Sequence, residues 1–478
     1  MTEATTAPQR LRRAAGKMPP DAGPGQLPAS LTRRRFGAIL AGLMLGMFLS
    51  ALDQTIVVAA ARTIGDDLNG LSQQAWLTTA YLVASTISTP IYGRLGDLYG
   101  PRRVLLVSVG IFLAGSAACS GATSMTMLAG LRVVQGLGAG GLFSLPLAIL
   151  ARLTNPRERA KYQSYTLSVF GISSVIGPVL GGFLAGADRI LGIRGWRWVF
   201  LINVPIGLVA FAVLAVFLHL PHRRRPERID VLGAVLLTIS LVPLLTVLQQ
   251  GRDWGWGSTR SIACYAASAV GLLLFVASQH RAGDQALMPL RFFRNPTFSL
   301  LSAAAVSTGM GTFGGLAVLP LYLQIVQGRT PGQAGLLALP LTIGLMTGSI
   351  VSGRQIARTG RYKIFPIVGT ALMIVGMSLL WTLDVDTPLW WTEIYTTVFG
   401  LGLGAVIQTL TLAVQTAVPP PDIGVATASV VFNRQVGATI GTAVFLSILF
   451  STVGANIGTA FVEAARTTSF RQALHDPA

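Results

Sequence analysis

The stretch GRLGDLYGPRR, from Gly93 to Arg103, lies between two long apolar runs. With one acid, Asp97, among arginines and glycines, it indicates a tight polar hinge between two membrane helices. A second copy, GRQIARTGRYK, runs from Gly353 to Lys363 between another two apolar runs, and Ala357 takes the place of Asp97. A basic, glycine-rich loop repeated at matching places predicts two related halves, as in duplicated transporter folds. The alternative is two ordinary basic loops on one side of a membrane.

Composition places the chain in the membrane, because 52% of its residues are hydrophobic and only 11% are charged. A run of about 20 apolar residues crosses a bilayer core. We therefore expect an all-α polytopic membrane protein with thirteen spans, at 36–61, 75–93, 103–121, 126–150, 163–186, 198–219, 230–249, 261–279, 298–324, 333–353, 364–382, 390–416 and 424–453.

The net charge of +18 does not predict a nucleic-acid partner, because most basic residues lie in loops between spans. Lys and Arg are concentrated in the N-terminal tail and in loops near residues 100, 157, 225, 290 and 358, which fall on one side. The positive-inside rule then places the N-terminus in the cytoplasm. The two cysteines and four histidines offer neither a disulfide framework nor metal-ligand spacing, so we expect no metal and no cofactor.

The repeated loops follow the second and the tenth predicted spans, so the spans at 230–249 and 261–279 are an extra pair between the halves. The predicted organisation is a disordered cytoplasmic tail at 1–35, an N-terminal six-helix half at 36–219, a linker and inserted helix pair at 220–296, a C-terminal half at 297–453 and an extracytoplasmic segment at 454–478. Two six-helix halves and a pair require fourteen helices. We expect the last helix to be missing here and the native protein to continue past Ala478.

Several motifs follow one another in a family order. The hinge resembles the signature between helices 2 and 3 of the major facilitator superfamily. Six further motifs are similar to those of its fourteen-helix drug:proton antiporters: LDQTIV (Leu52–Val57), LRVVQGLGAGG (Leu131–Gly141), GPVLGG (Gly177–Gly182), WRWVFLINVPIG (Trp196–Gly207), LPLYLQIVQGRTPGQAGLLALP (Leu319–Pro340) and FNRQVGATIG (Phe432–Gly441). The chain departs from the pattern at Val58 and Arg62, where a small polar residue and a proline are usual, and at Pro101.

Asp53 is the leading candidate for a proton site. It lies about 17 residues into the first predicted span, roughly 26 Å along a helix, and therefore within the hydrocarbon. An acid at that depth is costly and is a functional candidate by default. Burial disfavours the charged carboxylate, so Asp53 could bind and release a proton. The alternative is a structural acid paired with a buried arginine. Arg132, with Gln135 one turn further on, either modulates this site or joins helices through backbone contacts.

Two glycine-containing motifs predict conformational roles. The resemblance implies that Asp97 meets the start of the last predicted helix when the cytoplasmic side is closed, where a helix N-terminus favours a carboxylate. Gly93, Gly100, Arg102 and Arg103 belong to the same latch, and the two arginines are expected to add contacts. The resemblance also marks the antiporter motif, whose glycines allow close helix packing that prevents leak, with ordinary kinked packing as the alternative. Its members are Gly177, Pro178, Gly181 and Gly182.

A further group of polar residues within spans could line a substrate cavity or serve packing alone. It consists of Tyr81, Gln135, Tyr322, Gln324, Gln408, Arg434 and Glu393. Arg434 could pair with a lipid, a carbonyl or a substrate. Glu393 lies near an outer helix end, where wetting by solvent competes with a proton role.

The sequence therefore predicts a proton-coupled antiporter that exports amphipathic or lipophilic small molecules from the cytoplasm of a bacterium. Its expected partners are a small-molecule substrate, protons and the lipids of the cytoplasmic (inner) membrane, and it is expected to act as a monomer. The alternatives are a dedicated exporter of one lipid or self-made metabolite, or a non-transporting sensor on the same fold. An enzyme is not expected, because the sequence offers no nucleophile triad, metal cluster or phosphate loop.

Overall fold

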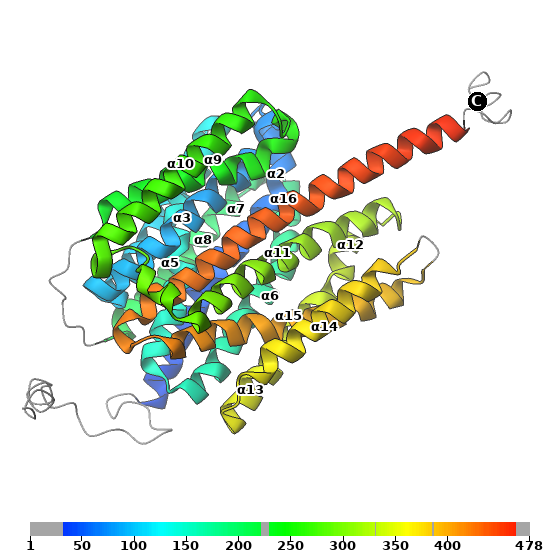
Figure 1. Cartoon of the computed structure of the whole chain (residues 1–478). Helices are drawn as coiled ribbons and strands as arrows, with labels where there is room; N and C mark the ends of the chain where they lie inside the picture. Colours follow the sequence, from blue (N-terminus) through cyan, green and yellow to red (C-terminus); the bar gives the residue numbers. More distant parts are fainter. Residues whose placement is uncertain (1–31, 221–228, 330, 385–386, 465–478) are drawn as a thin grey trace, which may run out of the picture.

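The computed structural model describes residues 32–220, 229–329, 331–384 and 387–464, and these residues form an all-α protein (Figure 1). Most of the predicted N-terminal tail and basic linker lie outside these ranges. The helices are α2 (Arg33–Asp67), α3 (Ala75–Tyr99), α4 (Pro101–Ser120), α5 (Met125–Leu153), α6 (Pro156–Gly186), α7 (Trp198–Leu201), α8 (Asn203–Phe217), α9 (Val231–Trp254), α10 (Thr259–Ala282), α11 (Pro296–Ile325), α12 (Pro331–Leu337), α13 (Leu339–Thr359), α14 (Ile364–Trp381), α15 (Leu389–Ala417) and α16 (Ile423–Ala464).

The helices form two bundles with a helix pair beside them. In the first bundle α3 packs on α5, α2 on α6 and α8, and α4 on α5. In the second, α13 and α14 pack on α15, and α11 packs on α16. The bundles meet mainly where α6 lies against α13 and α3 lies against α16. Helices α9 and α10 pack on each other, and α9 touches both α3 and α16.

The hinge is much shorter than the polar loop predicted from the sequence. Helix α3 continues through the motif to Tyr99, and α4 begins at Pro101, so Gly100 alone separates them. Gly100 has φ +94°, a backbone conformation that glycine adopts readily, and proline is favoured at the first position of a helix. In the second copy Gly360 ends α13 with φ +72°. We call the end of the molecule that carries Gly100 and Gly360 the hinge end.

Other helix boundaries also differ from the prediction, because hydropathy marks only the apolar part of a helix. Helix α2 starts earlier, where the Thr32 hydroxyl accepts a hydrogen bond from the Arg35 backbone nitrogen, and it ends later, at Asp67. The predicted span 198–219 is divided between α7 and α8. The predicted span 333–353 is similarly divided between α12 and α13, just before Pro340. Helix α16 continues to Ala464, whereas the sequence predicted an end at 453.

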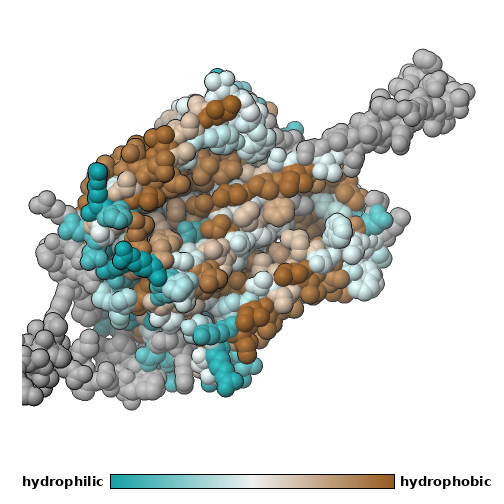
Figure 2. All heavy atoms as spheres, in the orientation of Figure 1, coloured by the Kyte–Doolittle hydropathy of each residue, from teal (hydrophilic) through white to brown (hydrophobic). Residues whose placement is uncertain are grey.

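Strands occur among the described residues only in a short β-hairpin, where β1 (Arg189–Ile190) pairs antiparallel with β2 (Ile193–Arg194) between α6 and α7. Ten helices among the described residues are long and apolar enough to cross a membrane. Figure 2 shows broad hydrophobic areas over α9 and α10 and along α14, which carry exposed Leu272, Leu273, Ile367 and Ile374. A lipid-facing surface explains this exposure in a chain of this composition.

Candidate functional site

Asp53 lies fully buried in α2 and accepts hydrogen bonds from three side chains. Its Oδ2 is 2.5 Å from Nη1 of Arg132, and its Oδ1 accepts bonds from Nε2 of Gln135 (2.8 Å) and Nδ2 of Asn203 (2.9 Å). The partners come from α5 and α8, so the carboxylate joins three helices of the first bundle. A buried ion pair persists when further hydrogen bonds satisfy its remaining atoms, as they do here.

Arg132 is held from several directions besides Asp53. Its Nε donates to the carbonyl of Leu77 at 3.0 Å, and its guanidinium lies 4.1 Å from the ring centroid of Tyr81. The hydroxyl of Tyr81 is 2.9 Å from Oγ of Ser50. The sequence left two interpretations of Arg132, a residue that modulates the Asp53 site or one that joins helices through backbone contacts. Both have a geometric basis, since Arg132 contacts the acid and also a backbone carbonyl.

Asn203 is a partner of Asp53 that the sequence reasoning did not select. It begins α8 within the quoted motif WRWVFLINVPIG, and it is fully buried. The amide also donates to Oγ of Ser116 at 3.0 Å. The sequence did carry a signal for Asn203, which is an amide within an apolar stretch. A buried amide requires hydrogen-bond partners, so such a residue is a candidate member of a buried polar cluster.

The GPVLGG motif (Gly177–Gly182) on α6 packs against α2 two residues beyond Asp53. A methyl group added to Gly177 would overlap Oγ1 of Thr55, and one added to Gly181 would lie 2.6 Å from the carbonyl oxygen of Ile56. Gly182 faces open space, with no atom within 4 Å of an added methyl group. Pro178 lies inside the helix. Close packing of α2 on α6 therefore depends on two of the three glycines.

At the hinge end, Asp97 connects the two bundles. Its Oδ2 accepts a hydrogen bond of 2.8 Å from the backbone nitrogen of Val425, in the first turn of α16. Its Oδ1 pairs with Arg152 at the end of α5. Gly93, one turn earlier, allows α3 to approach α16, because an added methyl group would overlap Ala428. Asp97 is 4% exposed, so both contacts are shielded from solvent.

The arginines of the hinge do not make the latch contacts expected of them. Arg102 donates to the carbonyl of Ala215 at 2.6 Å, which lies on α8 in the same bundle, and Arg103 is exposed. Arg152, which the sequence reasoning did not select, is the arginine that pairs with Asp97. Arg94 is buried and donates to the carbonyl of Asp284, beside the end of α10, at 2.8 Å.

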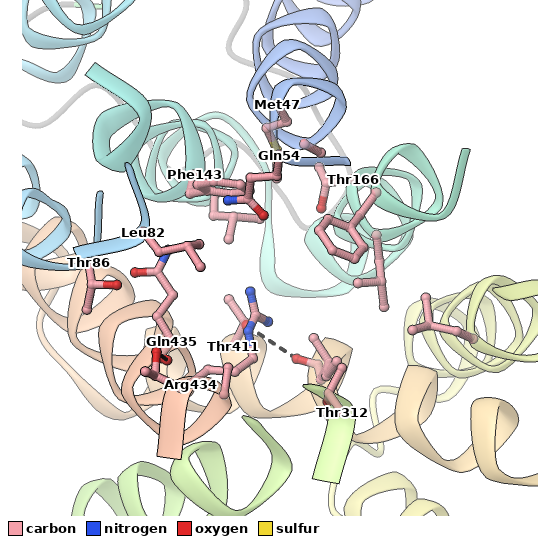
Figure 3. A pocket seen from close by; sticks show the side chains of 18 of the residues that line it. Met47, Gln54, Leu82, Thr86, Phe143, Thr166, Thr312, Thr411, Arg434 and Gln435 are labelled. Carbon is pink, nitrogen blue, oxygen red and sulfur yellow. Dashed lines mark hydrogen bonds between the residues drawn. The ribbon is translucent and has the colours of Figure 1, made fainter. Parts of the chain in front are cut away.

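A cavity of about 140 Å³ lies between the two bundles. Its lining comes from both bundles and from Gln249 on α9, as the labelled side chains in Figure 3 show in part. The wall from the first bundle is Met47, Ala51, Gln54, Leu82, Thr86, Phe143, Leu147, Gln163, Thr166, Leu167 and Phe170. The wall from the second is Thr312, Leu345, Ile407, Gln408, Thr411, Arg434, Gln435, Ala438, Thr439 and Thr442.

Between this cavity and the hinge end, polar contacts join the bundles. Nε2 of Gln408 donates to the carbonyl of Ala160 at 2.7 Å. Gln163 donates to Oε1 of Gln415 at 2.9 Å, and Gln415 in turn donates to the carbonyl of Leu147 at 3.3 Å. Together with the Asp97 contact, they join the two bundles on this side of the cavity.

The sequence profile of the Major Facilitator Superfamily matches residues 43–442. The chain belongs to this family. An uncharacterized MFS-type transporter of Mycobacterium tuberculosis is 37% identical over 467 residues, which are 97% of this chain and 65% of the relative. The multidrug transporter protein MdtP of Bacillus subtilis is 35% identical, over 84% of this chain and 73% of the relative. Multidrug resistance protein 3 of Bacillus subtilis is 33% identical, over 85% of this chain and 78% of the relative.

Solved structures share the fold. The MFS proton:xylose symporter XylE has a TM-score of 0.61 at 15% identity, covering 88% of this chain and 90% of that one. The human organic anion transporter MFSD10 has a TM-score of 0.60 at 17% identity, and the match covers 85% of this chain and 92% of that one. The predicted family, the major facilitator superfamily, and the predicted all-α polytopic fold are therefore confirmed. The chain spans 65% of the length of the mycobacterial relative, which is less than two thirds.

Seven polar residues were expected either to line a cavity or to serve packing alone, and five of them are not among the described lining residues. Tyr81 and Gln135 belong to the buried Asp53 cluster instead. The hydroxyl of Tyr322 donates to the carbonyl of Asp384 at 3.3 Å, Gln324 is half-buried, and Glu393 lies in a shallow depression beside Trp390. Gln408 and Arg434 do line the cavity. The two alternatives could not be separated beforehand, because a sequence shows which residues are polar but not which way each one faces.

Proposed function

We propose that this chain exports amphipathic small molecules from the cytoplasm by alternating access, in exchange for protons. The observation that carries the proposal is the cavity between the bundles. Its wall combines apolar side chains, including Phe143 and Phe170, with amides and hydroxyls from both bundles. Such a wall suits molecules that have an apolar body and a few polar groups. The names of the two Bacillus relatives, which are multidrug proteins, agree with this substrate range.

Alternating access follows from where the bundles meet. The hinge end is assigned to the cytoplasm, because the basic loops near residues 100 and 358 lie there. The structure then corresponds to a state whose cavity is closed toward the cytoplasm by Asp97 and Gln408. Rocking of the bundles would break these contacts and admit substrate from the inside.

Proton coupling is assigned to Asp53 and its partner Arg132. Protonation removes the negative charge that holds Arg132, Gln135 and Asn203, and so loosens α2 from α5 and α8. Helix α2 also contributes Met47, Ala51 and Gln54 to the cavity wall, so the proton state of Asp53 can alter the cavity without a direct contact to substrate. A coupling residue must be neutral in one state and charged in another, which a buried acid can achieve.

Uptake into everted membrane vesicles tests the proposal. Vesicles from bacteria that produce the chain are energised with a proton gradient and offered three fluorescent amphiphiles: anionic 1-anilinonaphthalene-8-sulfonate, neutral N-phenyl-1-naphthylamine and cationic ethidium. We expect accumulation of at least one probe above vesicles without the chain, and its loss when an uncoupler collapses the gradient. Equal signals with and without the chain for all three probes would contradict export of amphipathic molecules.

A further inference from the structure

Arg434 gives the cavity a charge that the rest of its wall does not balance. Of the described residues that line the cavity, Arg434 is the only ionisable one, and the other polar members are glutamines and threonines. Figure 3 shows its guanidinium reaching from α16 toward the middle of the cavity, with Gln54 and Phe143 on the wall opposite. The carboxylates of Asp53 and Asp97 are engaged elsewhere, by Arg132 and Arg152.

A guanidinium in such a place favours an anion. Arginine stays protonated in proteins, and Arg434 is only partly exposed to solvent, so an anionic group beside it would compensate its charge. No ion pair among the described residues involves Arg434. A guanidinium also offers parallel N–H donors that match a carboxylate, sulfonate or phosphate group.

The rest of the wall specifies the other parts of the ligand. Apolar side chains from both bundles, among them Leu82, Phe143, Leu167, Phe170 and Ile407, offer contact to a hydrophobic body. Gln435, the next residue on α16, also lines the cavity, and its amide nitrogen can donate a hydrogen bond to a neutral oxygen of a ligand. A cationic amphiphile would meet the positive charge of Arg434 with no carboxylate in the described wall to offset it.

We infer that the cavity selects amphipathic organic anions, with the anionic group held by Arg434 and the apolar body held against Phe143 and Phe170. This inference rests on the proposed export function and names its substrate class.

Binding of two matched probes to the whole chain in lipid nanodiscs tests the inference. 1-Anilinonaphthalene-8-sulfonate and N-phenyl-1-naphthylamine share one aromatic scaffold, and only the first carries a sulfonate. Saturable fluorescence above empty nanodiscs gives each affinity. We expect the wild-type chain to bind the anion about tenfold more tightly than the neutral probe, as one charge-assisted interaction allows.

The Arg434→Gln variant should lower the anion-to-neutral affinity ratio by roughly 10–100-fold, while Arg434→Lys keeps most of it. Arg260→Gln, which removes an exposed arginine at the start of α10, is the matched control and should keep the wild-type ratio. Size-exclusion profiles of all variants check folding. If Arg434→Gln misfolds, the affinities of the wild-type chain and of Arg434→Lys for ethidium and for the two matched probes still measure the charge preference of the cavity.

Three results would count against the inference, and they differ in scope. If wild type binds and transports N-phenyl-1-naphthylamine but prefers it or ethidium to the sulfonate, anion selection is wrong and export stands. If the anion-to-neutral affinity ratio of Arg434→Gln equals that of wild type, anion selection by Arg434 is likewise wrong and export stands. If no probe binds or is transported, the export proposal fails together with the anion inference.

Discussion

The carboxylate of Asp97, on α3, accepts a hydrogen bond of 2.8 Å from the backbone nitrogen of Val425 at the start of α16. These residues are 328 positions apart and belong to different bundles. The bond satisfies one of the backbone N–H groups that a helix start leaves open, and the positive end of the helix dipole favours the negative charge. Separation of the bundles at the hinge end must break this contact.

Replacing Asp97 should therefore favour the conformation that is open at the hinge end. Asp97→Asn removes the charge that faces α16 and Arg152, a loss of about 1 kcal/mol or more, which changes the population ratio roughly fivefold. Spin labels at Arg103→Cys and Thr416→Cys, in a chain with Cys119 and Cys264 replaced by alanine, should show a larger share of long distances. Asp66→Asn, at an exposed acid on α2, is the control. Identical distance distributions for Asp97→Asn and its parent would refute the latch.

The α2–α6 interface predicts opposite results for two neighbouring glycines. Gly181→Ala would place its methyl group 2.6 Å from the Ile56 carbonyl, a backbone atom, and should destabilise the protein by about 1–3 kcal/mol. Gly182→Ala meets open space and should leave thermal unfolding unchanged or slightly improved, since alanine favours helix. Unfolding temperatures in one detergent compare them. Equal temperatures would show that the packing is looser than described.

The Asp53–Arg132 pair should be more sensitive to loss of one member than of both. Arg132→Gln leaves the Asp53 carboxylate buried without its cation and should destabilise by about 3–5 kcal/mol. Adding Asp53→Asn removes that unpaired charge and should restore part of the loss. The thermal stability of the two single variants and the double variant measures the coupling. A double variant no more stable than Arg132→Gln would contradict the description of a tight buried pair.

The fold was predictable because its signals are local. Apolar runs gave the spans, and the repeated motif gave the turns at Gly100 and Gly360. The boundaries were less predictable, since helices continue into polar sequence, as α3 does through Asp97 to Tyr99. A helix can also be interrupted within an apolar run, as between α7 and α8. Such an interruption does not change the hydropathy of the run, so hydropathy cannot predict it.

The candidate site was predictable residue by residue but not in its pairings. Asp53 was selected because an acid in an apolar run is rare, and Arg132 for the same reason. That Asn203 would join them depends on how α8 packs on α2, which no local pattern encodes. In the same way Arg152 and not Arg102 pairs with Asp97, because the end of α5 lies beside α3 while Arg102 turns toward α8. Which residues line the cavity also depends on how each helix is rotated about its axis, and a single sequence does not show this.

Proton movement in proteoliposomes tests the central claim most directly, because it reports exchange of substrate for protons. Purified chain is reconstituted with a pH-sensitive dye inside, and a gradient of whichever probe the vesicles accumulate is imposed. We predict that the gradient drives protons the opposite way with wild type and with Asp188→Asn, an exposed acid used as control, but not with Asp53→Asn. Proton movement by Asp53→Asn at the wild-type rate, or none with wild type while the probe still crosses, would contradict the account.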